Sequence, residues 1–155
     1  MLVTKILARL ILTFTLRCKM NITVYSRNRM YETFERWDVP REFADTIANY
    51  LVYGYPSGSF FTAILANDFI GAVRHSHPIN TINSLKALAG WINECCPNEA
   101  YGSYAQVEAW YDMTSEMRRP ILEKKRIIYT EKQEVWMALK GESVSKTELI
   151  DLEWY

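Results

Sequence analysis

Between Asp38 and Trp110, apolar residues recur at helical spacing and are interrupted at short intervals by turn-forming residues. The interruptions fall at Asp38 with Pro40, Gly54 with Pro56 and Gly58, Asn67 with Asp68, His77 with Pro78, Cys96 with Pro97, and Gly102 with Ser103. Gly and Asn tolerate the left-handed backbone that ends a helix, and Pro lacks the amide hydrogen needed to continue one. Almost no linker remains between the apolar runs, so the pattern predicts a compact helical domain.

The first helix of this block is expected to follow Asp38, which can cap it, and Pro40, which suits a first turn. The run ends at Gly54. Apolar side chains that share one face of it are Phe43, Ile47, Tyr50 and Leu51. This spacing predicts an amphipathic helix with that face on the core.

Residues 60–65 form the next predicted helix, which Asn67 ends, and Asp68 can cap a further helix over residues 69–74. The longest periodic run covers residues 82–96. Its stripe consists of Ile82, Leu85, Leu88, Ala89, Ile92 and either Cys95 or Cys96. We expect this run to be the central core helix.

Three further helix starts are marked by capping boxes, in which Ser or Thr is followed three residues later by Gln or Glu. They are Ser103 with Gln106, Thr130 with Gln133, and Ser145 with Glu148. Each stands before apolar residues, so each predicts the beginning of a helix.

Residues 21–29 alternate and begin with β-branched side chains, which favours a short strand or an extended arm. The end of the basic segment 118–130 is either a strand that pairs with residues 21–25 or a helix that continues through Tyr129. The predicted fold class is mainly α: a single compact multi-helix domain of about six to eight short helices, with a minor two-stranded β element from residues 21–25 and 126–130.

Three segments organise this fold. Residues 1–37 form an N-terminal extension and basic arm, 38–112 the helical core domain, and 113–155 a C-terminal helical tail that packs on the core. Residues 6–16 are apolar but too short to span a membrane and are followed by no cleavage site, so a secretory signal is not favoured. Met20 is an alternative start that would leave residues 1–19 outside the natural product.

Composition limits the function classes. The chain has 155 residues, 49% apolar and 14% aromatic, which excludes a disordered protein. Its net charge is zero, which argues against a protein that coats nucleic acid or a membrane through bulk charge. The charge is nevertheless uneven: residues 1–41 carry eight Lys or Arg against three acids, and residues 42–116 carry two against eight. A basic arm therefore precedes an acidic body.

Residues that could carry chemistry are few. His75, His77, Cys95 and Cys96 are nominal metal ligands, but adjacent cysteines strain a tetrahedral site, and no motif supports a thiol nucleophile. The sequence has no nucleotide-binding glycine loop and no hydrolase elbow. We therefore expect no catalytic residue, no cofactor and no metal. An odd count of three cysteines indicates a reducing, cytoplasmic setting.

A set of turn, cap and core residues within residues 39–112 resembles a family of small helical phage and prophage proteins. The residues that carry the resemblance are Pro56, Ser57, Gly58, Phe60, Ala63, Ile64, Leu65, Ala66, Asn67, Asp68, Ala72, Asn80, Pro97, Gly102, Ser103, Val107 and Trp110. The resemblance implies a fold and a phage origin but no reaction. The segments on either side are therefore expected to hold the function of this particular protein.

The first functional hypothesis is a non-enzymatic phage accessory protein that binds and modulates or inhibits a host macromolecule. The expected target is chiefly a protein, anti-phage defence proteins included. The expected location is the host cytoplasm, with no membrane partner. The alternative is a nucleic-acid-binding accessory protein that uses basic segments 27–41 and 118–126. A metal- or thiol-dependent enzyme ranks third. Trp, Tyr and Arg anchor interfaces, which selects the candidate contacts. They are Arg27, Arg29, Tyr31, Arg36, Trp37, Arg118, Arg119, Lys124, Lys125, Arg126, Trp136, Trp154 and Tyr155.

Overall fold

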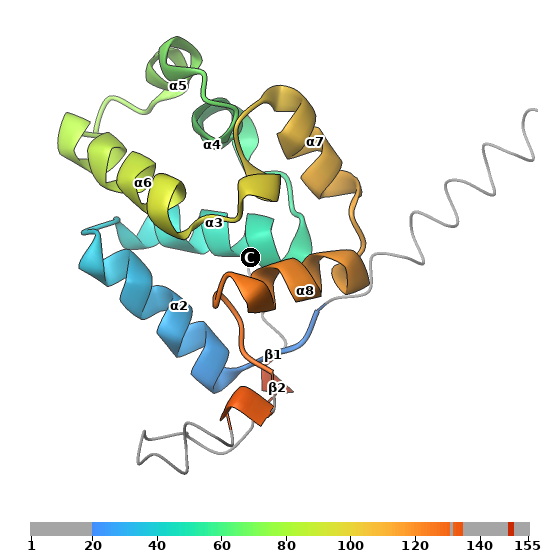
Figure 1. The fold of residues 1–155 in the computed structure, drawn as a ribbon. Coiled ribbons are helices and arrows are strands. Elements are labelled where there is room, and N and C mark those ends of the chain that lie inside the picture. The colour runs from blue at the N-terminus through green and yellow to red at the C-terminus, as the bar shows by residue number, and fades with distance from the viewer. Residues whose placement is uncertain (1–19, 131, 135–148, 151–155) are drawn as a thin grey trace, which may run out of the picture.

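A computed structural model of the chain describes residues 20–130, 132–134 and 149–150. Helices dominate these residues, which confirms a mainly α fold (Figure 1). The long helices are α2 (Val24–Arg36), α3 (Arg41–Tyr53), α6 (Ile82–Cys95) and α8 (Ser115–Lys124). The shorter ones are α4 (Gly58–Leu65), α5 (Phe69–His75), the 3-10 turn η1 (Asn98–Ala100) and α7 (Tyr104–Asp112). The two strands are β1 (Ile22–Thr23) and β2 (Leu149–Ile150).

The central helix is α3, which lies in the middle of the bundle with α2, α6 and α8 around it (Figure 1). Eight of its 13 residues are buried. The expectation that residues 82–96 form the core helix is wrong in part, because only Leu88, Trp91 and Ile92 of α6 are buried. Ile82 is 82% exposed. The apolar stripe of α6 therefore serves the core at one end and faces solvent at the other.

Several predicted caps are present. The Ser103 hydroxyl accepts a hydrogen bond from the amide of Gln106 at 3.2 Å and begins α7. The Thr130 box closes in both directions: the Gln133 amide donates to the Thr130 hydroxyl at 3.2 Å, and the Thr130 amide donates to the Gln133 side chain at 2.9 Å. The third box, Ser145 with Glu148, lies outside the described residues. Local signals thus place the starts of these two helices correctly.

Asp38 does not cap α3. Its backbone is left-handed, with φ of 56°, and its amide donates to the carbonyl of Glu35 at 3.0 Å. It therefore closes the end of α2, and α3 begins directly after Pro40.

The strand prediction needs two corrections. Residues 24–29 are helical, because the Thr23 hydroxyl accepts the Ser26 amide at 3.1 Å and so starts α2. Strand β1 pairs in antiparallel register with β2, Ile22 opposite Ile150 and Thr23 opposite Leu149, and not with residues 126–130.

Residues 126–130 neither form a strand nor extend α8. Arg126 is left-handed with φ of 60°, and the amides of Arg126 and Ile127 return to the carbonyls of Glu123 and Leu122 at 3.0 and 2.9 Å. This pair of hydrogen bonds is the Schellman motif, which ends a helix. Ile127 and Ile128 then enter the core.

One hydrophobic core joins all three segments predicted from the sequence, and it includes described residues from Met20 to Ile128. Phe34 of α2 stacks on Trp91 of α6 with ring centroids 4.2 Å apart. The Trp110 indole donates to the carbonyl of Tyr50 at 3.1 Å, and the Tyr50 hydroxyl donates to the carbonyl of Ala100 at 2.7 Å. The part of the chain that the structure describes therefore packs as one body.

Within the described ranges, no helix is both long enough and apolar enough to cross a membrane.

Candidate functional site

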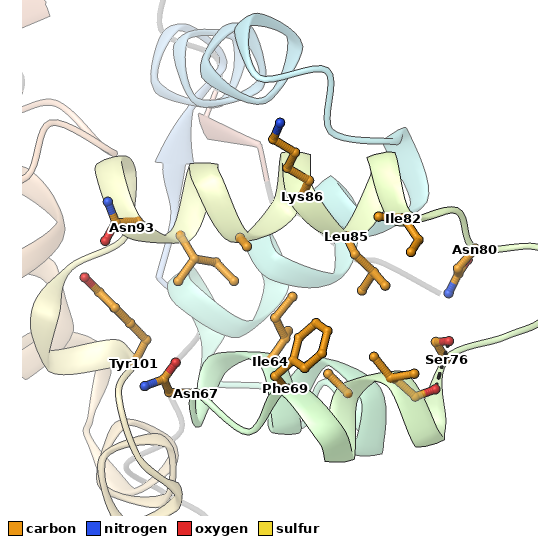
Figure 2. Close-up of a pocket in the computed structure, with 14 residues that line it drawn as sticks. Ile64, Asn67, Phe69, Ser76, Asn80, Ile82, Leu85, Lys86, Asn93 and Tyr101 are labelled. Carbon is orange, nitrogen blue, oxygen red and sulfur yellow. Dashed lines mark hydrogen bonds between the residues drawn. The ribbon is translucent and has the colours of Figure 1, made fainter.

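A groove of about 670 Å³ lies between α4 and α5 on one side and α6 on the other. We call it the α5–α6 groove. Its walls are mainly apolar: Ile64 and Phe69 face Ile82 and Leu85 across it (Figure 2). Polar side chains close both ends. They are Asn67, Asn93 and Tyr101 at one end and Ser76 and Asn80 at the other (Figure 2).

The groove follows from how α5 begins. Asn67 is left-handed, with φ of 62°, and Asp68 caps α5 by accepting the Gly71 amide at 2.9 Å. Helix α5 therefore starts directly after α4 and lies against it. It has only seven residues, of which Ala72 alone is buried. Such a short helix buries one narrow face, and its other apolar side chains remain in solvent.

Five apolar side chains around the groove are exposed to an unusual degree. Their exposed fractions are 75% for Phe69, 78% for Ile70, 47% for Val73, 78% for Ile79 and 82% for Ile82. Burying one such side chain fully is worth roughly 1.5–3 kcal/mol. Phe69, Val73 and Ile82 line the groove, and Ile70 and Ile79 lie next to or near them in the chain. A large exposed apolar surface marks an interaction site more often than a chance arrangement.

The charge around the groove differs from that of the surrounding block. Residues 69–93 contain two cations, Arg74 and Lys86, and no acid. The neighbouring carboxylate of Asp68 accepts bonds from the Tyr104 hydroxyl at 2.6 Å and from the Gly71 amide, and these bonds lower its pKa. Both cations are exposed, and the Lys86 side chain points away from the α5 wall (Figure 2). The groove is therefore an apolar, weakly basic surface in an acidic body.

Tyr31 is not an available contact residue, contrary to the sequence prediction, because it is buried. Its hydroxyl donates to Asp45 at 2.6 Å, and the guanidinium of Arg41 lies 4.2 Å from the ring centroid. Burial, with the bond to Asp45, raises the pKa of the Tyr31 hydroxyl. Helical spacing on α2 turned this ring toward α3, so Tyr31 joins two helices.

Arg118 is also buried, and it does not belong to an exposed cationic cluster. Its Nε donates to the carbonyl of Val52 at 3.3 Å, and its Nη1 donates to the carbonyl of Met113. A cation at the carboxyl end of a helix interacts favourably with the helix dipole. Arg118 therefore stabilises the end of α3.

The other predicted contacts within the described residues lie at the surface or close to it. Arg27 and Arg29 are half-buried, while the exposed ones are Arg36, Trp37, Arg119, Lys124, Lys125 and Arg126. Arg29 pairs with Glu32 at 2.8 Å and Arg119 with Glu123 at 3.0 Å. Trp136, Trp154 and Tyr155 lie outside the described residues.

One cation from each basic segment, Arg36 and Lys125, acts on the thiol of Cys95. Burial raises the pKa of the Cys95 thiol, and the charges of Lys125 and Arg36 act against that rise. Arg36 ends α2 and Lys125 follows α8, so cations from both segments stand close to the end of α6. Trp37, also exposed, lies over α6, because a Cβ at Gly90 would stand 2.7 Å from its ring.

The histidines and cysteines do not assemble a site among the residues described. His75 and His77 line a smaller cavity of about 290 Å³ with Glu42. Cys96 is fully buried, and burial raises the pKa of its thiol, which disfavours the reactive thiolate. No group of three or more His, Cys, Asp or Glu suited to a metal ion occurs in the described ranges.

Sequence reasoning missed the α5–α6 groove because it assigned every apolar residue of the central block to the core. A signal was nevertheless present. Phe69 and Ile70 stand side by side, and one face of a seven-residue helix cannot bury both. The absence of acids from residues 69–93, within an otherwise acidic block, was a second signal.

Comparison with protein-family models, with curated proteins and with solved structures gave no match for this chain.

Proposed function

We propose that this protein is a non-enzymatic accessory protein that binds another protein in the α5–α6 groove and modulates or inhibits it by occupying its surface. The observation that carries the proposal is the set of exposed apolar side chains Phe69, Val73 and Ile82, which line one cavity, together with exposed Ile70 and Ile79 in the same stretch of chain. A partner that covers these side chains removes their apolar surface from water, and this burial favours binding. The proposed contact surface lies in the central block, whereas the sequence hypothesis located it in the flanking segments.

The biological setting remains the one that the resemblance over residues 39–112 implies. In that setting the protein is of phage origin and acts in the host cytoplasm on a host protein, anti-phage defence proteins among them. The groove lies entirely within those residues. Proteins of that family that share this helical body would then share the docking surface as well.

The test is capture of a partner from bacterial lysate by chemical crosslinking, with groove and control variants side by side. Phe69→Ser and Ile82→Ser should each lower capture of a stoichiometric partner at least tenfold, since each removes an exposed apolar anchor. Met117→Ser is the matched control: Met117 is exposed and apolar but lies on α8. Equal capture by all three variants would refute the proposal.

A second candidate function is nucleic-acid binding, which the approach of Arg36 and Lys125 near Cys95 favours. Exposed Trp37 beside them could stack on a base. Binding of single-stranded and duplex DNA and of RNA should then weaken steeply with salt, and Lys125→Glu should weaken it for every sequence. Lack of binding at low salt would end this candidate.

A further inference from the structure

We propose that the segment bound in the α5–α6 groove is an amphipathic α-helix with acidic residues beside its apolar face, lying along α6. The inference rests on the proposed function, and it specifies the chemistry of the partner. Four features of the groove support it: the kind of elements that form its walls, the polar side chains at its ends, the extent of its apolar surface, and the sign of its charges.

The walls favour a helix because they are themselves helices. An α-helix presents apolar side chains at positions i, i+3, i+4 and i+7, and such a face fits the furrow between two helices. Addition of a strand would need a sheet edge, and the described strands β1 and β2 lie on another side of the molecule (Figure 1). Helix α6 has 14 residues and is therefore about 21 Å long, which suits a partner of about four turns.

The polar ends of the groove suit a helix as well. A helix leaves amides unpaired at its first turn and carbonyls unpaired at its last. Asn67 and Asn93 stand at one end of the groove and Asn80 at the other (Figure 2). A side-chain amide can both donate and accept, so these residues can serve either end of a bound helix.

The apolar surface extends beyond the cavity, which favours a macromolecule over a small ligand. Ile70 and Ile79 are both 78% exposed, yet neither lines the groove. A compact molecule that filled about 670 Å³ would leave both side chains in water. A helix with further residues attached would cover them.

The charge favours an acidic partner over a second copy of this chain. Arg74 and Lys86 are the charged residues among residues 69–93, and both are exposed. A contact between two copies would bring together two basic surfaces, with no acid among residues 69–93 of either copy to meet the cations of the other, which opposes association. Acidic side chains beside the apolar face of a partner would instead be attracted to these cations.

The experiment uses fluorescent, lactam-constrained helical peptides of about 14 residues, the length that matches α6. All share one apolar face of Leu and Phe, and they carry Glu, Gln or Lys beside it. A scrambled Glu peptide without an apolar face controls for charge alone. At low salt, fluorescence anisotropy should show the Glu peptide binding about tenfold more tightly than the Lys peptide, with the difference shrinking at high salt.

Variants of the protein test where and how the peptide binds. The double variant R74E/K86E should reverse the preference between the Glu and Lys peptides. Reversal of two exposed cations on α8, R119E/K124E, should leave the preference unchanged. Ile82→Ser should weaken every peptide, and its circular dichroism spectrum and urea midpoint should match those of the parent chain.

Each contrary outcome is specific. Equal binding of the Glu, Gln and Lys peptides overturns the acidic partner but leaves the proposed function standing. Absence of peptide binding, with partner capture still lost in Phe69→Ser, overturns the helix alone. Partner capture that is indifferent to Phe69→Ser overturns the proposed function. A dimer in sedimentation analysis that Ile82→Ser abolishes would instead assign the groove to a second copy.

Discussion

At the scale of single residues, burial decides the role of several side chains that look like surface groups in the sequence. Arg118 stands among four other cations, yet it is buried against the carboxyl end of α3. Gly54 belongs to the same contact, since a Cβ there would stand 2.7 Å from the Arg118 guanidinium. The sequence marks Gly54 as a helix end and gives no sign of its partner. Two predictions follow from this contact.

Gly54→Ala should destabilise the protein more than Gly58→Ala. Both glycines have positive φ, 66° and 85°, so alanine is strained at each by roughly 1–2 kcal/mol. A Cβ at Gly58 meets open space, whereas at Gly54 it displaces buried Arg118 and adds roughly 1–3 kcal/mol. Urea unfolding gives both free energies. Equal losses would show that the position of the Arg118 guanidinium does not depend on having glycine at residue 54.

Arg118→Met should lower the free energy of unfolding by roughly 2–4 kcal/mol, because it removes charge-assisted hydrogen bonds to buried carbonyls. Arg119→Met on the same helix should cost about 0.5 kcal/mol or less, since its pair with Glu123 is exposed at Arg119. Thermal and urea unfolding of both variants provide the measurement. A loss in Arg119→Met as large as that in Arg118→Met would contradict the assigned roles.

At the scale of elements, a single periodic stripe can serve two surfaces. The stripe on α6 begins at Ile82, which is exposed at the groove, and reaches Leu88 and Ile92, which are buried. The periodicity is uniform along the helix. What changes is the neighbour: α5 is too short to cover the first turns of α6, while α2 and α3 belong to the core that its later turns join.

Alanine substitutions of Ile82, in the first turn of α6, and of Leu88, in its middle, should change the free energy of unfolding by very different amounts. Leu88→Ala should cost about 2–5 kcal/mol, because it leaves a cavity in the core. Ile82→Ala should change the free energy of unfolding by about 0.5 kcal/mol or less, because its side chain is already in solvent. Denaturant unfolding of the two variants tests this. A core-sized loss for Ile82→Ala would mean that the groove is closed in the protein.

Two helix caps should also contribute differently to the free energy of unfolding, because one of them makes a further hydrogen bond. Thr23 caps α2 and donates to Glu134, a buried carboxylate that also accepts from Ser26 at 3.3 Å. Thr81 caps α6 at the surface, accepting the Ser84 amide at 3.1 Å. Thr81→Ala should cost about 1 kcal/mol, and Thr23→Ala roughly 1–3 kcal/mol more. If calorimetry shows equal losses, the link to Glu134 contributes nothing.

At the scale of the whole molecule, the described residues of segments 1–37, 38–112 and 113–155 share one core, as the predicted single domain requires. Met30 and Phe34 of α2 lie in the same cluster as Trp91 and Trp110 of the central block. Leu122 of α8 joins it as well. From residue 20 onward, the basic arm predicted from the sequence therefore contributes side chains to the core.

Phe34→Ala should therefore destabilise the central block as well as α2, by about 3–5 kcal/mol. Its ring stacks on Trp91 at 4.2 Å, so the loss reaches α6 directly. Tryptophan fluorescence and far-ultraviolet circular dichroism should report one coincident unfolding transition, shifted together in the variant. Two separated transitions would show that the segments fold independently.

Much of the fold could be predicted from local chemistry, and the α5–α6 groove could not. Gly54, Asn67 and Ser103 mark helix ends and starts through their own backbone and hydroxyl groups, so sequence alone locates them. Phe69 and Ile82 look like core residues because hydrophobicity is the same property in a core and at an interface. Only the packing of α5 against α4 shows that nothing in the described part of the chain covers them.

What the sequence determined by itself is a mainly α fold, the position of most helix boundaries, and an apolar content sufficient for one core. These follow from the preferences of Gly, Pro, Asn and Ser at chain positions a few residues apart. The tertiary structure decided which apolar faces meet, that Tyr31 and Arg118 are buried, and that the stripe of α6 opens into a groove. The physical reason is that burial depends on contacts between residues far apart in the chain, and local periodicity carries no information about whether a facing partner is present.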